Sequence, residues 1–217
     1  MEPWTLIIGN KNYSSWSLRA WLVLKHAGVP FEEQLVLLDR PDSSTELAKA
    51  SPSRRVPVLR IGDLSVWDSL AIAETVAERA PAAGLWPADP DARALARAVT
   101  CEMHSGFAAL REHMPMNVRR HAPGMGRKPG VAEDIARIQA LWGETRARFG
   151  AGGPLLFGAF TIADAFFAPV VSRFVTYEVE VDASSRAYMD AIWALPAMED
   201  WRTAAAAETS ASRKYDL

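Results

Sequence analysis

The chain has 217 residues, 49% of them apolar, and a formal net charge of -2 at pH 7, which gives no reason to expect nucleic acid or an anionic membrane surface as a partner. Its single cysteine, Cys101, excludes an intrachain disulfide framework and a CxxC pair for redox chemistry or zinc. No uncharged apolar run is long enough to span a bilayer. The N-terminus also lacks the regions of a signal peptide, so we expect a soluble, cytoplasmic protein without a metal centre.

The first 80 residues alternate between strand-like and helix-like segments. Strands are predicted at 4–9, 31–38, 56–61 and 64–67, and helices at 16–27, 44–50 and 69–79. The opening strand, helix and strand predict a parallel crossover unit, and the Gly62-Asp63 pair is typical of a hairpin turn. The order of the elements predicts an α/β domain over residues 1–80.

The composition changes after residue 80. A segment rich in Pro, Ala and Gly over 81–91 is interpreted as a linker, and residues 92–217 show no convincing strand and are predicted to be all helical. Apolar residues at steps of three and four predict that this part begins with one long helix. They are Leu95, Val99, Met103, Phe107, Leu110 and Met114. Further helices are predicted at 135–149, 161–175, 184–194 and 197–207, and the residues beyond about 205 are expected to fray.

Four short motifs lie at junctions between predicted elements. They are NYSSWSLR (12–19), SPSRRVPVL (51–59), DSLAIAE (68–74) and GAFTIAD (158–164). In this order and spacing they resemble the cytosolic glutathione S-transferase family, in particular its serine-type, zeta-like bacterial members. The resemblance covers nearly the whole chain. It implies a thioredoxin-like N-terminal domain that binds glutathione, followed by an all-helical C-terminal domain.

Ser14 and Ser15 stand at the start of the first predicted helix. A thiol with a pKa of about 8.5 is mostly protonated at neutral pH. A hydroxyl that donates a hydrogen bond to the sulfur, with a helix N-terminus behind it, favours the thiolate. The resemblance aligns Ser14 with the activating serine, with Ser15 and then Tyr13 as alternatives. Either serine also suits the plain role of a helix N-cap.

Val56 and Pro57 open the third predicted strand. A proline is tolerated at the start of a strand, and from the residues alone a trans peptide bond before Pro57 is expected. The resemblance implies a cis bond instead, with the backbone of Val56 paired to the cysteinyl backbone of glutathione. Arg40, Arg54 and Arg55 are candidate partners for the glycine carboxylate of the tripeptide.

Asp68 and Ser69 stand where a strand turns into a helix, and free N–H groups at such a place bind anions. The resemblance assigns Ser69 to the γ-glutamyl carboxylate of glutathione and Asp68 to its ammonium group, and plain helix capping is the alternative. Thr161 and Asp164 form a T-x-x-D capping box, for which we favour a structural role.

The second-substrate site is drawn from the first-helix loop and from the helical part of the chain. The candidates are Tyr13, Trp16, Met103, Phe107, Arg111 and Arg173. Trp16 replaces the cysteine that is usual in the zeta pattern, which argues against thiol–disulfide or dehydroascorbate chemistry. Arg173 lies about one helical turn from the position where zeta enzymes carry an arginine for the substrate carboxylate.

The resemblance implies a homodimeric enzyme that uses glutathione as co-substrate and activates its thiol for attack on an electrophilic small molecule. A glutathione-dependent cis–trans isomerase of the zeta type is a close alternative, in which the thiol adds and leaves again. A non-catalytic interaction or regulatory protein with the same fold is the alternative from another class. The serines and the Val56-Pro57 and Asp68-Ser69 pairs argue against it, because a scaffold has no need of a thiol site.

Overall fold

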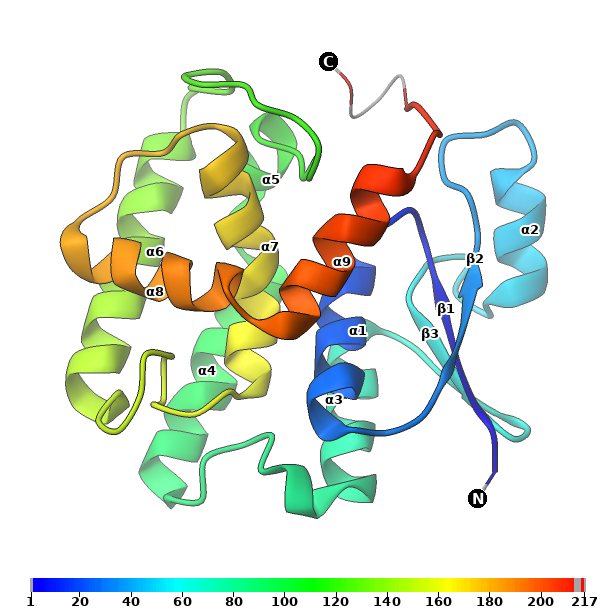
Figure 1. Ribbon diagram of the computed structural model, residues 1–217, viewed down its shortest axis with the longest axis horizontal. Coiled ribbons are helices and arrows are strands. Elements are labelled where there is room, and N and C mark those ends of the chain that lie inside the picture. The colour runs from blue at the N-terminus through cyan, green and yellow to red at the C-terminus, as the bar shows by residue number, and fades with distance from the viewer. Residues whose placement is uncertain (1, 213–215, 217) are drawn as a thin grey trace.

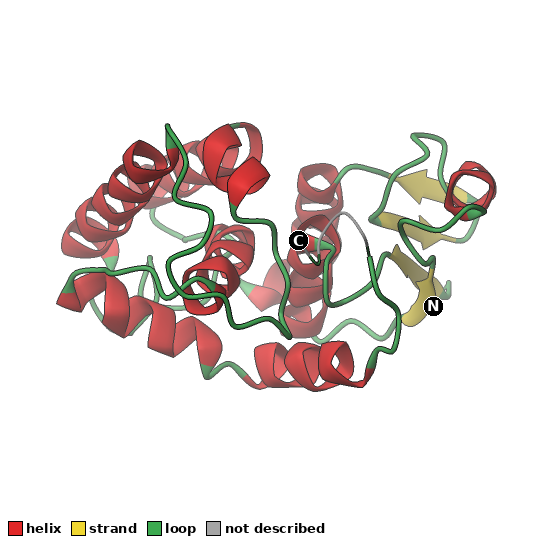
Figure 2. Cartoon of the chain, turned by 90° about the horizontal axis from the view of Figure 1, so that it is seen from above, coloured by secondary structure: helices red, strands yellow, loops and turns green. Residues whose placement is uncertain are grey.

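The computed structural model describes residues 2–212 and 216, and its strands gather at one end of the molecule (Figure 1, Figure 2). The sheet end comprises β1 (Trp4–Ile8), α1 (Ser15–Ala27), β2 (Glu32–Leu35), α2 (Ser43–Ala50), β3 (Val58–Ile61), β4 (Leu64–Val66) and α3 (Ser69–Arg79). The helical end comprises α4 (Pro90–Ser105), α5 (Ala108–His113), α6 (Val131–Phe149), α7 (Ile162–Thr176), α8 (Ala183–Trp193) and α9 (Pro196–Ala207). This is the predicted class: a thioredoxin-like α/β part joined to an all-helical part.

The four strands form one sheet in the order β2-β1-β3-β4. β1 pairs with β2 in parallel, as expected for a crossover through α1, while β3 runs antiparallel to both β1 and β4. Alternate residues of β1 pack into different layers, because successive side chains of a strand point to opposite faces. Leu6 belongs to the main core with α1, whereas Ile7 packs in a small cluster with Val58 and with Ala50 of α2.

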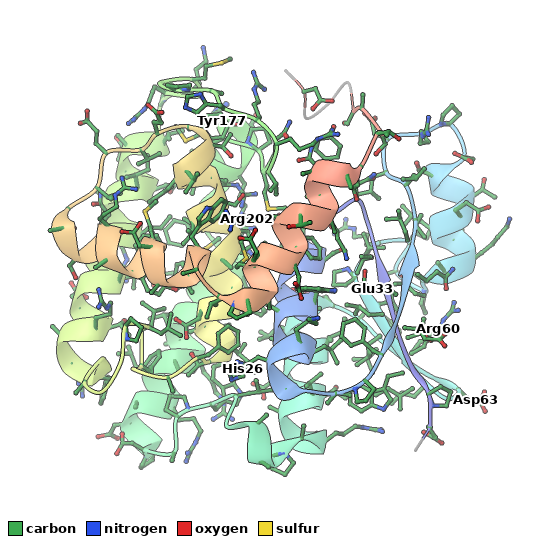
Figure 3. The ribbon with its side chains drawn as sticks, in the orientation of Figure 1. His26, Glu33, Arg60, Asp63, Tyr177 and Arg202 are labelled. Carbon is green, nitrogen blue, oxygen red and sulfur yellow. The ribbon has the colours of Figure 1, made fainter. Side chains whose placement is uncertain are left out.

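Polar contacts tie the helices to the strands that they cover. Glu33 of β2 accepts a hydrogen bond from the indole N–H of Trp21 at 2.6 Å. Its carboxylate also forms an ion pair with the ammonium group of Lys11, at 2.6 Å. Arg60 of β3 donates to the carbonyl oxygen of Ala50 at 3.0 Å. Figure 3 labels Glu33 and Arg60 on the sheet. These contacts fix α1 and α2 relative to the sheet and so set the position of the loops between them.

The expectation of one long helix over 95–114 is wrong. α4 ends at Ser105 and α5 begins at Ala108, because Phe107 takes a left-handed conformation with φ of 60°. The guanidinium of Arg111 turns back and donates to carbonyl groups at the end of α4, including that of Gly106 at 2.8 Å. Met103 before the break and Leu110 after it are both fully buried. The apolar periodicity therefore continues across the break, and the sequence pattern alone does not reveal where the helix ends.

A buried carboxyl group closes the start of α7. Asp164 is fully buried and accepts hydrogen bonds from Thr161 N at 2.8 Å, Thr161 Oγ1 at 3.0 Å, Leu156 N at 3.1 Å and the Tyr188 hydroxyl at 3.2 Å. Burial raises the pKa of Asp164 to about 6, although these four hydrogen bonds act in the opposite direction. Among the helices that the structure describes, none has the length and apolar character needed to cross a membrane.

The raised pKa of Asp164 predicts a pH-dependent stability. An acid whose pKa is higher in the folded than in the unfolded chain takes up its proton first in the folded chain, so it favours folding at low pH. That contribution is lost as the pH rises from about 4 to about 6. We expect wild type to lose up to about 3 kcal/mol relative to Asp164→Asn across this window. Urea unfolding of both proteins at several pH values measures the difference, and parallel curves would contradict the raised pKa.

Candidate functional site

The loop between β1 and α1 is held from both ends of the molecule. On the sheet side, Asn10 Oδ1 accepts from Leu38 N at 2.8 Å. On the helical side, the side chain of Asn12 donates to Asn117 Oδ1 and accepts from Arg119 N, both at 2.9 Å. Both asparagines are buried. The loop therefore presents the first turn of α1 at a fixed place between the two parts of the chain.

The two candidate serines occupy different chemical positions at the start of α1. Ser14 is the N-cap: its Oγ accepts from Ser17 N at 3.3 Å and donates to Ser17 Oγ at 2.7 Å. Ser17 Oγ in turn accepts from Gly9 N at 3.1 Å. The hydroxyl of Ser15, in the first turn, makes no hydrogen bond within the described part of the chain. Both serines line the same cavity.

The hydroxyl of Tyr13 is engaged with the C-terminal segment. It hydrogen-bonds both carboxylate oxygens of Asp216, at 2.9 and 2.8 Å, and accepts from Arg119 at 3.0 Å. Burial, followed by the hydrogen bond to Asp216, raises the pKa of Tyr13. A hydroxyl already held by a carboxylate is a weaker candidate for activating a thiol than either serine.

The segment after α9 lies against the β1–α1 loop and does not fray as expected over its described residues. The carboxylate of Glu208 accepts from Lys11 N at 2.6 Å and from Asn12 N at 3.1 Å. Ser212 Oγ donates to Asp39 at 2.7 Å. An alanine- and serine-rich composition gave no sign of these contacts, because their partners lie 173 to 197 positions earlier in the chain.

A cavity of about 370 Å³ lies where β3 and α3 begin. It is lined by Trp16, Ser53, Arg55, Val56, Pro57, Trp67, Asp68 and Ser69. The Val56-Pro57 bond is cis, and so is the Trp67-Asp68 bond. The hydroxyl of Ser69 is buried and, within the described residues, has no hydrogen-bond partner. A buried polar group of this kind indicates a place where a ligand completes the hydrogen bonding.

Asp68 connects this cavity to the helical part. Its carboxylate caps α3 by accepting from Leu70 N at 2.9 Å, and it pairs with Nε2 of His104 on α4 at 3.0 Å. Burial lowers the pKa of His104, and Arg19 and Arg111 act in the same direction, while Asp68 opposes them. The cap engages one carboxylate oxygen and His104 the other. Because a carboxylate oxygen accepts more than one hydrogen bond, Asp68 can cap α3 and still face the cavity.

A larger cavity of about 850 Å³ opens beside the first. Its walls come from the β1–α1 loop and the start of α1, the loop after β2, α2, the loop before β3, α5 with the loop after it, and α7. The lining residues are Tyr13, Ser14, Ser15, Trp16, Leu38, Leu47, Arg54, Arg55, Val56, Ala108, Arg111, Glu112, Pro115, Met116 and Arg173. Trp16, Arg55 and Val56 line both cavities. The two spaces therefore meet at these three residues, next to the serines.

Three of the proposed site residues lie outside both cavities. Arg40 lines a separate hollow beside α2, with Gln34 and Glu46. Met103 and Phe107 are 0% and 7% exposed and belong to the hydrophobic core. They follow the same helical periodicity as a pocket wall would, and periodicity does not distinguish the core from a cavity lining.

Two predicted arginines, Arg111 and Arg173, do reach the larger cavity. Arg173 is 4% exposed and donates to the carbonyl groups of Met114 at 2.9 Å and Pro169 at 3.1 Å. Burial lowers the pKa of Arg111. The cavity therefore has four cationic side chains in its wall, Arg54, Arg55, Arg111 and Arg173, against one acid, Glu112. Within the described residues, no group of three or more His, Cys, Asp or Glu side chains gathers as a metal site would require.

Comparison with known proteins defines the class of this molecule. Residues 13–79 match the family model of the glutathione S-transferase N-terminal domain, and residues 128–206 match that of the C-terminal domain. The chain belongs to the glutathione S-transferase family.

Its relatives place it more narrowly. A maleylpyruvate isomerase from Ralstonia is 31% identical over 79% of this chain and 85% of the relative. A probable maleylacetoacetate isomerase from Caenorhabditis elegans is 28% identical over 72% of each chain. A crystal structure of a glutathione transferase homologue from Burkholderia with bound glutathione is 26% identical, with a TM-score of 0.72 over 96% of this chain and 100% of that chain. The resemblance to zeta-like members is confirmed.

Proposed function

We propose that this enzyme of the glutathione S-transferase family binds glutathione in the smaller cavity and activates its thiol at the junction with the larger one. The backbone of Val56 pairs with the cysteinyl unit of the tripeptide, and Asp68 and Ser69 hold its γ-glutamyl end. The unpartnered, buried hydroxyl of Ser69 carries the proposal. The Burkholderia homologue crystallised with glutathione supports the ligand.

The serines supply the hydrogen bond to the sulfur. A hydroxyl is both donor and acceptor and rotates to suit its partner. In the Ser14–Ser17 pair the bond reverses when a thiolate arrives: Ser17 donates to Ser14, and Ser14 donates to the sulfur. Ser15 donates without any rearrangement. Ser14 remains the first candidate because Ser17 supports it, and Ser15 remains the alternative. The thiolate then attacks an electrophilic carbon of a molecule in the larger cavity.

Loss of the Ser69 hydroxyl tests the binding site. We expect Ser69→Ala to weaken glutathione binding about 10- to 150-fold, since a hydrogen bond to a carboxylate contributes about 1.5–3 kcal/mol. Isothermal titration calorimetry measures the affinity. Thr75→Ala is the matched control, because the Thr75 hydroxyl lies on the same helix but bonds the carbonyl of Ala71. Absence of glutathione binding by wild type would contradict the proposed function.

Substitution of each serine tests thiol activation. We expect Ser14→Ala to raise the pKa of bound glutathione by about one unit and to slow conjugation about tenfold below that pKa, with little change in affinity. The thiolate absorbance of the complex against pH and the rate with a chromogenic electrophile are the measurements. An unchanged thiol pKa would transfer the role to Ser15.

Stability separates catalysis from capping in these variants. Loss of the Ser14 cap is expected to lower the free energy of unfolding by about 1 kcal/mol, whereas Ser15→Ala leaves it within about 0.5 kcal/mol of wild type. A variant that loses stability but retains the thiol pKa therefore identifies a cap alone.

A glutathione-dependent cis–trans isomerase is the second candidate function. The relatives from Ralstonia and Caenorhabditis elegans are named as isomerases, and the cations Arg111 and Arg173 in the wall of the larger cavity suit a carboxylate-bearing substrate. In this reaction the thiolate adds to one carbon of a cis double bond, the resulting single bond rotates, and the thiolate leaves to give the trans isomer. The same thiol site serves both functions.

A panel of substrates separates the two candidates. We expect an isomerase to convert a cis-dicarboxylic keto acid to its trans isomer with glutathione regenerated, and Arg173→Gln to raise KM for that acid while sparing an uncharged electrophile. Product analysis by NMR follows both reactions. Conjugation of neutral electrophiles without any isomer conversion would contradict the isomerase and leave the transferase.

A further inference from the structure

Arg19 lies on α1, one helical turn after Ser15, and its side chain is fully buried. Its Nε, Nη1 and Nη2 atoms all lack a hydrogen-bond partner within the described part of the chain. A buried charged group without hydrogen bonds opposes folding by a large free energy. An arginine nevertheless stays protonated in a protein interior, so Arg19 carries a positive charge at this place.

Two aromatic rings lie close to this charge, and within the described residues no carboxylate forms an ion pair with it. The guanidinium carbon lies 4.3 Å from the ring centroid of Trp16 and 4.8 Å from that of Phe166, where cation–π attraction partly replaces hydration. Burial lowers the pKa of Arg19 well below its usual value, and the neighbouring cations Arg111 and Arg173 act in the same direction.

Two further groups face this region from the α3 and α4 side. Asp68 is the carboxylate that opposes the lowering of the Arg19 pKa, and it is shared with His104. The His104 ring packs edge-on against Trp16 at 5.2 Å between centroids. Asp68 is thus shared between Arg19, His104 and the cap of α3, while Asp134 is the acid that acts on Arg111. The region behind Trp16 has an excess of positive charge.

Protein stability does not account for such an arrangement. Replacing a buried charge by an apolar side chain of similar volume is often neutral or stabilising. The location indicates a different role, because Trp16 is part of the wall where the two cavities meet. The guanidinium of Arg19 lies against the ring of a residue that lines this junction, and that of Arg111 lies over the same ring at 5.1 Å. The low dielectric of the interior strengthens the attraction between such buried cations and an anion at the junction.

We propose that Arg19 is a positioning residue that lowers the pKa of the thiol of bound glutathione by its charge, acting through Trp16 without touching the sulfur. The inference rests on the proposed function, since it assumes that the glutathione sulfur lies at the junction. It differs from the role of the serines, which donate a hydrogen bond. The thiol loses its proton to solvent, and the anion is stabilised by the serine hydroxyl in front and the guanidinium behind.

Charge-removing and charge-keeping variants test this proposal. We expect Arg19→Met to raise the pKa of bound glutathione by about one unit, so that kcat/KM for conjugation falls about tenfold at pH values below the thiol pKa and recovers at high pH. Arg19→Lys keeps the charge and is expected to stay near wild type. Arg146→Met is the matched control: Arg146 also has a buried, unpartnered Nε, but it lies on α6 and bonds the carbonyl of Ser184 at 2.8 Å.

Unfolding in urea separates an electrostatic role from a packing role. The proposal predicts that Arg19→Met is at least as stable as wild type and yet has the raised thiol pKa. A variant that is destabilised while its thiol pKa stays unchanged shows that Arg19 serves packing alone, and this result would overturn the proposal.

A second probe does not depend on glutathione. In a Cys101→Ser background, Ser15→Cys places a thiol on the same face of α1 as Arg19, four residues earlier. The pH dependence of alkylation of this thiol by iodoacetamide gives the pKa of the thiol. Adding Arg19→Met is expected to raise that pKa by about one unit. If wild type fails to bind glutathione while the introduced thiol still shifts, the proposed function fails and the electrostatic effect of Arg19 stands. If glutathione binds but neither thiol pKa shifts, the inference fails and the proposed function stands.

Discussion

The proposed chemistry depends on the fixed position of the first turn of α1. A sulfur anion is stabilised there by hydroxyl and N–H groups only if those groups point to one place before the ligand arrives. Asn10 attaches the preceding loop to the sheet side, and Asn12 attaches it to the helical side. Glu208 adds hydrogen bonds from the C-terminal segment. Three distant parts of the chain, near Leu38, Asn117 and Glu208, thus determine where two serine hydroxyls lie.

The second feature of the site is an excess of positively charged side chains around its two cavities taken together. Arg54, Arg55, Arg111 and Arg173 line the cavities, and Arg19 packs against Trp16 of their shared wall. The net charge of the whole chain is slightly negative, so this positive field is local. It favours a thiolate, and it equally favours an anionic second substrate. The two candidate functions differ only in the fate of the thiolate adduct, and both use this field.

The family motifs led to residues that the structure brings together around two adjoining cavities, because each motif lies at a junction of elements whose ends are well marked; their roles toward glutathione stay a prediction. The helix over 69–79 was predicted with its observed bounds, since Asp68 caps it and Arg79 ends it. The second-substrate side was predicted less well. Arg111 and Arg173 reach the cavity, whereas Met103 and Phe107 do not. A side chain's position along an apolar stripe does not tell whether its neighbour is protein or open space.

The sequence by itself determined the order of the elements, the two-part organisation and the polar groups at the helix N-termini, because these follow from local periodicity, capping and turn chemistry. The tertiary structure decided which of those groups share a cavity, where the chain turns at Phe107, and that the segment after α9 returns to the β1–α1 loop. It also decided that Arg19 is buried without a hydrogen-bond partner. Each of these depends on contacts between residues far apart in the chain, and burial of a charge has no local signature in the sequence.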